Sequence, residues 1–183
     1  MARVYVTQTA RFAVSSSITL LQIVASASAG LEIVRAWASQ DSSTSSVQNH
    51  IAILRKTGSA TVTACVVTPL SPADAAALAT SGGSATGEGT DGLTLIQDSF
   101  NILNGWLYLP VPEERIYVPP GSTIALKFMA APPTSASFVA GFVFREGGGK
   151  YCFRQDNPPK RLDYFQRESP LKSNRDANIA VLS

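Results

Sequence analysis

Apolar and polar residues alternate along most of the first 145 positions, which is the pattern of strands with one buried face. The alternation is clearest in residues 122–131, where Ile124, Leu126 and Phe128 fall on one face and smaller or charged residues fall between them. Clusters of Ser, Gly and Pro bound most such runs and mark strand ends. The pattern predicts further strands at residues 4–11, 18–25, 31–39, 47–56, 61–68, 100–109, 115–118 and 137–145.

Two connections break this pattern. Residues 71–78 predict a helix of one or two turns, since Ser71 is a favourable N-cap and Pro72 suits the first helical position. The glycine-rich residues 80–92 predict a flexible surface loop. Short strands joined by one long connection are typical of an all-β, jelly-roll-like antiparallel β-sandwich. An immunoglobulin-like sandwich is the competing architecture, although the Cys…Trp…Cys spacing of such domains is absent.

The character of the chain changes after Arg145. Three glycines, at positions 147–149, form a predicted hinge, so we expect a β-sandwich body at residues 1–146 and an extended C-terminal arm at residues 147–183. The body holds eight basic and nine acidic residues, whereas the arm holds seven basic and four acidic ones. Attraction to an acidic partner is therefore expected from the arm.

The arm is expected to bind a partner through aromatic and basic side chains. It interleaves them as single-strand nucleic-acid binders do, but its four acidic residues favour protein docking over nucleic acid. Residues 179–182 could add an edge strand to another subunit. The predicted partner-binding residues are Tyr151, Phe153, Lys160, Arg161, Leu162, Tyr164, Phe165 and Arg167.

Low charge and strand pattern also indicate self-association of the body. Charged residues make up 15% of the chain, below the usual value of about 25%, which suits a surface packed among other subunits. In residues 31–38, Leu31, Ile33 and Trp37 alternate with other apolar residues, so both faces of this strand are expected to be semi-apolar. One sandwich core cannot bury both, and we expect a homo-oligomer, most simply a trimer.

Catalytic and cofactor-binding signals are weak. His50 is the only histidine and is expected on the polar rim of a strand, so no catalytic residue is assigned. Cys65 and Cys152 cannot form a zinc site without carboxylates, and we expect free thiols made in a reducing compartment and no cofactor or metal. The longest apolar stretch, residues 18–29, is too short and too polar to cross a membrane.

Two acidic pairs have structural interpretations as well as chemical ones. Glu113 and Glu114 are neighbours on an expected strand and point to opposite faces, so a local ion pair with Arg115 is favoured over a catalytic pair. Glu88 and Asp91 could offer oxygens to a calcium ion, but they lack the dense acidic spacing of a calcium loop. A turn is the favoured role for the segment that holds them.

A resemblance to a known family is carried by three runs of the chain. They are Glu88-Gly-Thr-Asp-Gly92, Phe100-Asn-Ile-Leu-Asn-Gly-Trp-Leu-Tyr-Leu-Pro110 and Pro112-Glu-Glu-Arg-Ile-Tyr-Val-Pro-Pro-Gly121. They resemble the jelly-roll cement or decoration proteins on the heads of tailed bacteriophages, often trimers. The resemblance implies a non-enzymatic virion subunit, made in the host cytoplasm, that binds itself and the major capsid protein on the outer surface of the capsid. It supplies no catalytic residues.

The alternative is a carbohydrate-binding or receptor-binding β-sandwich module. Trp106 and Tyr108 share a strand face and could form an aromatic platform for sugars. Exposure of these rings would favour the alternative, whereas their burial would favour the cement function.

Overall fold

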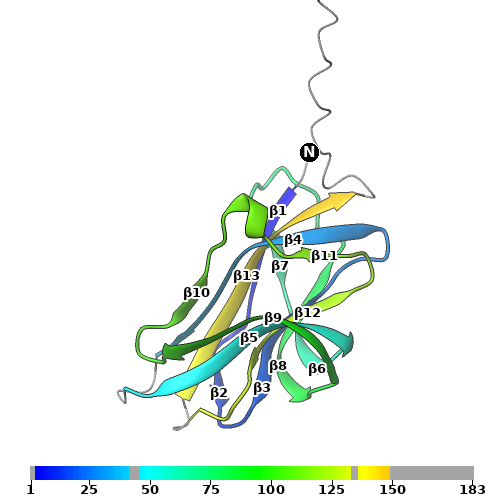
Figure 1. Ribbon diagram of the computed structural model, residues 1–183. Helices are drawn as coiled ribbons and strands as arrows, with labels where there is room; N and C mark the ends of the chain where they lie inside the picture. The colour runs from blue at the N-terminus through cyan, green and yellow to red at the C-terminus, as the bar shows by residue number, and fades with distance from the viewer. Residues whose placement is uncertain (1–2, 42–45, 133–135, 149–183) are drawn as a thin grey trace, which may run out of the picture. The chain divides into compact units, whose positions relative to one another are not determined.

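Two antiparallel sheets form a β-sandwich in the computed structural model, which describes residues 3–41, 46–132 and 136–148 (Figure 1). Sheet A has the order β10-β4-β13-β1-β7, with β11 paired to β4 and β2 paired to β13. Its strands are β1 (Arg3–Gln8), β2 (Phe12–Val14), β4 (Ala29–Gln40), β7 (Val67–Pro69), β10 (Trp106–Tyr108), β11 (Tyr117–Val118) and β13 (Ala136–Gly148).

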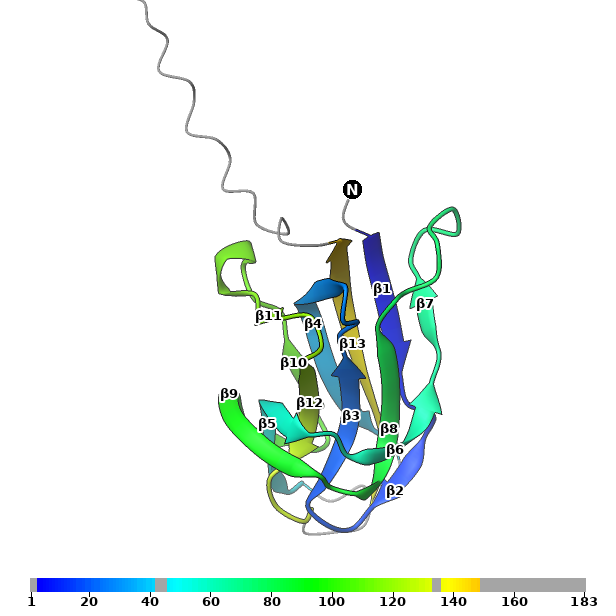
Figure 2. The same cartoon turned by 90° about the vertical axis from the view of Figure 1, so that its right-hand side faces the viewer.

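Sheet B has the order β6-β8-β3-β12-β5-β9. Its strands are β3 (Ile18–Val24), β5 (Gln48–Gly58), β6 (Thr61–Cys65), β8 (Thr80–Gly87), β9 (Thr90–Asn101) and β12 (Thr123–Phe128). The successive strands β3, β4 and β5 alternate between the sheets, and β12 returns to lie between β3 and β5 (Figure 2). This crossing confirms the predicted jelly-roll-like antiparallel sandwich.

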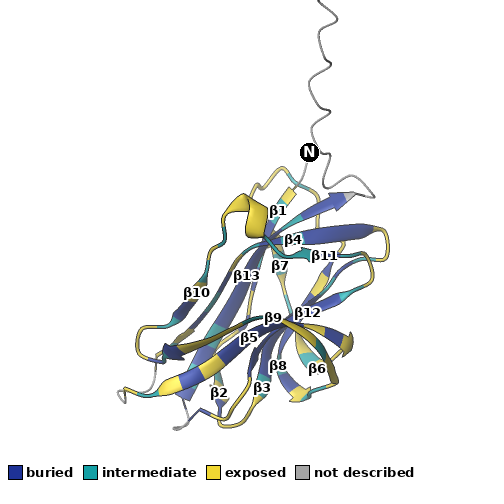
Figure 3. Cartoon of the chain, viewed as in Figure 1, coloured by how far each residue is buried: buried dark blue, intermediate teal, exposed yellow. Residues whose placement is uncertain are grey.

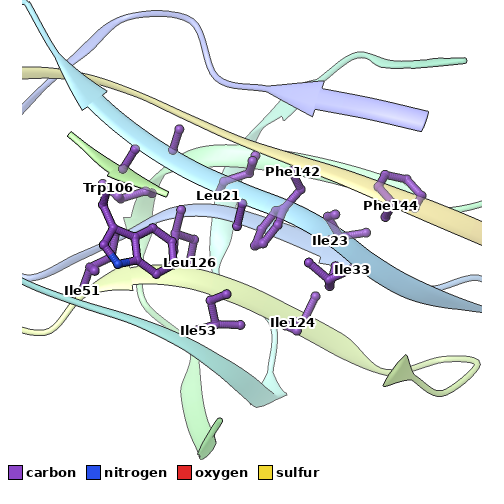
Figure 4. Close-up of a cluster of buried hydrophobic side chains, with 14 of the residues drawn as sticks. Leu21, Ile23, Ile33, Ile51, Ile53, Trp106, Ile124, Leu126, Phe142 and Phe144 are labelled. Atoms are coloured by element: carbon purple, nitrogen blue, oxygen red, sulfur yellow. The ribbon is translucent and has the colours of Figure 1, made fainter. Parts of the chain in front are cut away.

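The core lies between the inner faces of the two sheets. Ile33, Phe142 and Phe144 of sheet A face Ile23 and Leu126 of sheet B, and all five are fully buried (Figure 4). Burial is strongest along the central strands β4, β13, β3 and β12 (Figure 3). The alternation of the sequence therefore reports the inner faces correctly for most strands.

A bulge in β4 changes which residues share a face from the arrangement that the sequence pattern predicts. Leu31, Ile33, Ala36 and Ala38 all point into the core, because the register with β13 shifts and leaves Val34 without a Cα partner. Because the bulge adds one residue to the strand, odd-numbered residues point into the core before it and even-numbered residues point into the core after it. Leu31, Ile33, Ala36 and Ala38 thus share the core, whereas Val34 and Trp37 stay half-buried outside it, and self-association stays a prediction.

The helix predicted at residues 71–78 is absent, and that prediction is wrong. The connection makes one backbone hydrogen bond of its own, from the Asp74 N–H to the Ser71 carbonyl at 3.0 Å, and side chains from sheet A hold the rest. The buried carboxylate of Glu146 accepts the N–H groups of Leu78 at 2.9 Å and Ala79 at 2.7 Å, and the Tyr5 hydroxyl donates to a carbonyl of the connection at 3.0 Å. These distant partners replace the hydrogen bonds that a helix would make.

The predicted loop at residues 80–92 is also wrong, since it forms β8 and the start of β9. Glycine is required in β8 by close approach and not by a turn. A Cβ on Gly83 would lie 2.7 Å from the carbonyl oxygen of Leu20, and one on Gly82 would lie 2.9 Å from the carbonyl oxygen of Thr63. The glycines let β8 fit between β3 and β6.

Two further strand boundaries differ from the sequence pattern. The run at residues 100–109 divides into the end of β9 and β10, because a turn with Gly105 at φ +69° separates them. β13 continues past Arg145, and Gly147 and Gly148 pair with β4, so the first two hinge glycines belong to the sheet. The division into a body and an arm stays a prediction.

Candidate functional site

Four charged groups meet on the outer face of sheet B. Lys56 from β5 and Lys127 from β12 face Glu88, in the turn between β8 and β9, and Asp91 of β9. The Lys56 ammonium lies 3.0 Å from Asp91 Oδ1 and 3.6 Å from Glu88 Oε2. The Lys127 ammonium lies 2.6 Å from Asp91 Oδ2 and 3.1 Å from Glu88 Oε2. We call these four residues the charge cluster.

Hydrogen bonds tie the charge cluster to the neighbouring strands. Thr19 of β3 donates its backbone N–H to Glu88 Oε1 at 2.7 Å and its hydroxyl to Oε2 at 2.8 Å. Lys56 also donates to the backbone carbonyl of Glu88. The side chain of Lys56 is fully buried, whereas those of the two acids are about one-third exposed. The cluster therefore fastens the β8–β9 turn over the face of the sheet.

The surroundings favour the charged forms of Glu88, Asp91 and Lys127. Partial burial by itself would raise the pKa of Glu88, but hydrogen bonds from Thr19 and Lys127 outweigh it and lower that pKa. Burial likewise opposes the lowered pKa of Asp91, where bonds from Lys127 and Lys56 prevail. Burial would lower the pKa of Lys127, but hydrogen bonds to the two carboxylates raise it.

Two ammonium groups therefore take up the oxygens that were considered as calcium ligands. Two positive and two negative charges leave the cluster neutral. Within residues 3–41, 46–132 and 136–148, no group of three or more His, Cys, Asp and Glu residues could hold a metal ion. The cluster is better suited to holding the fold than to binding a cation.

The two aromatic residues considered as a sugar platform are engaged by the body. Trp106 is 7% exposed and donates its indole N–H to Asp98 at 3.0 Å, which links β10 to β9. Tyr108 stacks on it with ring centroids 6.4 Å apart and an interplanar angle of 9°. The Tyr108 hydroxyl donates to the carbonyl of Glu114 at 3.1 Å. Little of the Trp106 ring remains available to a ligand.

His50 is exposed on β5, as its place in the pattern predicts. Its imidazole makes no hydrogen bond or ion pair with any residue that the structure describes. A base without an orienting carboxylate lacks the geometry of a nucleophile-activating pair.

The expected ion pair of Arg115 with its sequence neighbours is wrong. Glu113 and Glu114 are exposed in a 3-10 turn, η1 (Pro112–Glu114), while Arg115 pairs with Glu32 of β4 at 3.2 Å. Both side chains of this pair are 14% exposed. Pairing across the sheet anchors the segment before β11.

Cys65 forms no disulfide with any residue that the structure describes, and burial raises the pKa of its thiol. It lines a groove of about 460 Å³ at the edge of the sandwich where the chain passes from β6 to β7. Other residues lining this groove are Val6, Thr9, Ala64, Val66 and Thr68. Cys152 lies outside the described residues, so the absence of a disulfide between the two cysteines stays a prediction.

Exposed aliphatic side chains form a feature that the sequence analysis missed. Leu107 is 59% exposed, Leu109 is 65% exposed and Val111 is 54% exposed. They occupy every second position of the segment from β10 to η1, and we call them the ridge. The alternation of these apolar residues with others is visible in the sequence, but the same pattern fits a buried strand, which is what residues 100–109 were predicted to form.

The predicted arm residues lie outside the described residues. These are Tyr151, Phe153, Lys160, Arg161, Leu162, Tyr164, Phe165 and Arg167. Their role as partner-binding residues stays a prediction.

Comparison with protein families, curated proteins and solved structures found no match to this chain. No helix in the part of the chain that the structure describes is long and apolar enough to cross a membrane.

Proposed function

We propose that this chain is a non-enzymatic structural subunit that decorates a virion. In this function it binds the outer surface of a bacteriophage capsid, bridges capsomers and stabilises the shell. Its partners are further copies of itself, as a homotrimer, and the major capsid protein. No nucleic acid, membrane or cofactor takes part.

One contrast on the body supports this proposal above all. Its buried ionisable groups hold turns and connections in place: the charge cluster fastens the β8–β9 turn, and Glu146 holds the connection to β8. Its exposed large apolar side chains, by contrast, are leucine and valine with one methionine, and most of them lie within residues 66–78 and 103–111. A surface of this kind suits contact with other subunits.

Burial of Trp106 favours this function over a carbohydrate-binding or receptor-binding module. Sugar platforms present open aromatic faces, whereas the Trp106 ring is 7% exposed and its N–H is bound to Asp98. In the proposed function the arm provides attachment, with its aromatic residues as anchors and Lys160, Arg161 and Arg167 meeting acidic groups on the shell.

Mixing the purified chain with undecorated phage heads tests the proposal. We expect the chain to co-sediment with the heads up to a fixed number of copies per shell and to raise the temperature at which the heads disrupt. Heads already saturated with the chain are the control, because any further chain that sediments with them is carried down without specific binding. Absence of saturable co-sedimentation, together with binding to a glycan panel, would favour the carbohydrate-binding alternative.

A further inference from the structure

Two segments at the lateral edges of the sandwich contain no charged side chain. Residues 61–70, which contain β6 and β7, and residues 99–112, which contain β10 and the ridge, include no Asp, Glu, Lys or Arg. Sheets commonly protect their free edges with charged side chains, especially lysine. An uncharged edge is suited to contact with another protein surface.

The uncharged segments lie on opposite sides of the sandwich. β10 and β7 end the strand order of sheet A, and β9 and β6 end that of sheet B. Figure 2 shows β9 and β10 along one side and β6 and β7 along the other. Each copy therefore presents two different uncharged segments on opposite sides, although β9 beside the ridge carries Asp91 and Asp98.

The two surfaces differ in form. On the β10 side the ridge projects Leu107, Leu109 and Val111, each more than half exposed. On the β7 side lies the groove of about 460 Å³, with Val66 at its border 79% exposed. The ridge thus offers exposed aliphatic side chains, and the groove offers a hollow whose lining contains no charged residue, so neither surface would bury an unpaired charge on contact.

Proline limits how the ridge can pair. Pro110 and Pro112 alternate with the ridge residues and have no N–H to donate to an added strand. Contact along this edge therefore relies on side chains more than on an extended ladder of backbone hydrogen bonds.

We propose that the ridge of one copy inserts into the groove between β1, β6 and β7 of a second copy. The inference rests on the self-association in the proposed function and specifies its interface. Because the two surfaces differ, the contact is head-to-tail, and repeating it gives a closed ring if the rotation between copies closes and an open row of copies if it does not. Three copies is the number that the proposed function expects.

Charge substitutions in the full-length chain test this contact. Leu109→Lys and Val66→Glu each place a charge in an apolar interface, so light scattering should show the mass of a single chain for either variant at micromolar concentration. The double variant, with both changes in one chain, should recover the ring at low salt, because each Lys then meets a Glu of the neighbouring copy. Leu93→Lys is the matched control, since Leu93 is 68% exposed near the opposite end of β9 and belongs to neither surface. It should keep the mass of the unsubstituted chain.

The outcomes separate this inference from the proposed function. A monomeric unsubstituted chain, or a Val66→Glu variant that keeps the full mass while remaining folded, overturns the ridge-in-groove contact. If the variants change mass as expected but the unsubstituted chain does not co-sediment with heads, the ridge-in-groove contact is supported and only the decoration function is contradicted. Heads that bind a chain shown to be monomeric contradict the contact alone. Equal melting temperatures across the variants exclude unfolding as the cause of a lost ring.

Discussion

At the scale of single residues, the charge cluster shows how a sandwich can bury lysine on an outer face. The Lys56 side chain is fully buried and that of Lys127 is 10% exposed, yet each ammonium has two carboxylates within 4 Å. Desolvation of an unpaired ammonium would be costly, so the four residues depend on one another.

Lys56→Met should destabilise the fold. Removing one partner of a fully buried ion pair lowers the free energy of unfolding by about 3 to 5 kcal/mol. Because the two carboxylates here are about one-third exposed, the expected loss is smaller, about 2 kcal/mol. Urea unfolding measures this loss. The control is Arg11→Met, which removes an ion pair to Asp41 with both side chains more than half exposed and should cost about 0.5 kcal/mol or less. Equal effects of the two substitutions would contradict a structural role for the cluster.

The cluster also predicts how stability depends on pH. The pKa values of Glu88 and Asp91 lie below their ordinary values of 4.5 and 3.8, so their contribution is complete above those values and is lost as pH falls through the lowered pKa values. The pKa of Lys127 lies above 10.5, so its contribution is complete below that value and is lost as pH rises through the raised pKa.

Unfolding free energies measured from acid to neutral pH test the acid side. We expect a plateau down to about pH 4.5 and then a fall. Asp91→Asn removes one of the titrating groups and should give a lower plateau with a shallower fall. Identical slopes in both proteins would show that other carboxyl groups dominate acid unfolding.

His50→Ala should leave both fold and function nearly unchanged. The side chain is exposed and has no partner among the described residues, so the stability change should be about 0.5 kcal/mol or less. Melting temperature and co-sedimentation with heads measure the two properties. Loss of an activity in a folded variant would instead indicate an enzyme.

At the scale of elements, β8 depends on glycine for its place in sheet B. The strand passes so near its neighbours that a Cβ on Gly83 would lie 2.7 Å from the Leu20 carbonyl oxygen. Backbone oxygens cannot move aside as a flexible side chain can, so the sheet itself would have to shift.

Gly83→Ala should therefore destabilise the body by about 1 to 3 kcal/mol. Gly87→Ala, in the same strand, is the matched control, because the nearest atom to its Cβ would be Thr61 Oγ1 at an ordinary contact of 3.4 Å. That variant should remain within about 0.5 kcal/mol of the unsubstituted chain. A melting curve of each variant decides between them, and equal tolerance would mean that β8 adjusts freely.

At the scale of the whole molecule, the end of β13 gives a natural point for separating body from arm. Gly147 and Gly148 pair with Gly30 and Ala29 of β4, so the strand should be kept intact in any truncation. The arm contributes seven basic residues, and the proposed function assigns attachment to it.

Truncation after Gly148 should leave a folded body that attaches more weakly to heads. Added salt should reproduce part of that loss with the full chain, since exposed charge pairs are screened over about 8 Å at physiological ionic strength. Circular dichroism and co-sedimentation measure the two effects. An unfolded truncated chain would show that residues beyond 148 contribute to the core.

Local pattern was sufficient for the fold class and for most strands. Alternation with period two reports which residues face a core, and this signal depends only on near neighbours in the chain. In β12 it identifies the inner residues correctly, but the expected single buried face is wrong, because Thr123, Ala125 and Lys127 on the other face are buried too. The exposed position of His50 followed from the same pattern.

What the pattern could not determine depends on residues far apart in sequence. The bulge at Val34 arises from the pairing of β4 with β13. The glycines of β8 are required because the backbones of β3 and β6 lie so close to them. Arg115 forms its ion pair with Glu32 of β4, which is distant in sequence. In the sequence Lys56 and Lys127 have the pattern of surface lysines, and only the folded structure shows that they pair with Asp91 under the β8–β9 turn. Register, close approach and charge pairing between distant strands are decided only when the two sheets come together, because the chain carries no local signal of its eventual neighbours.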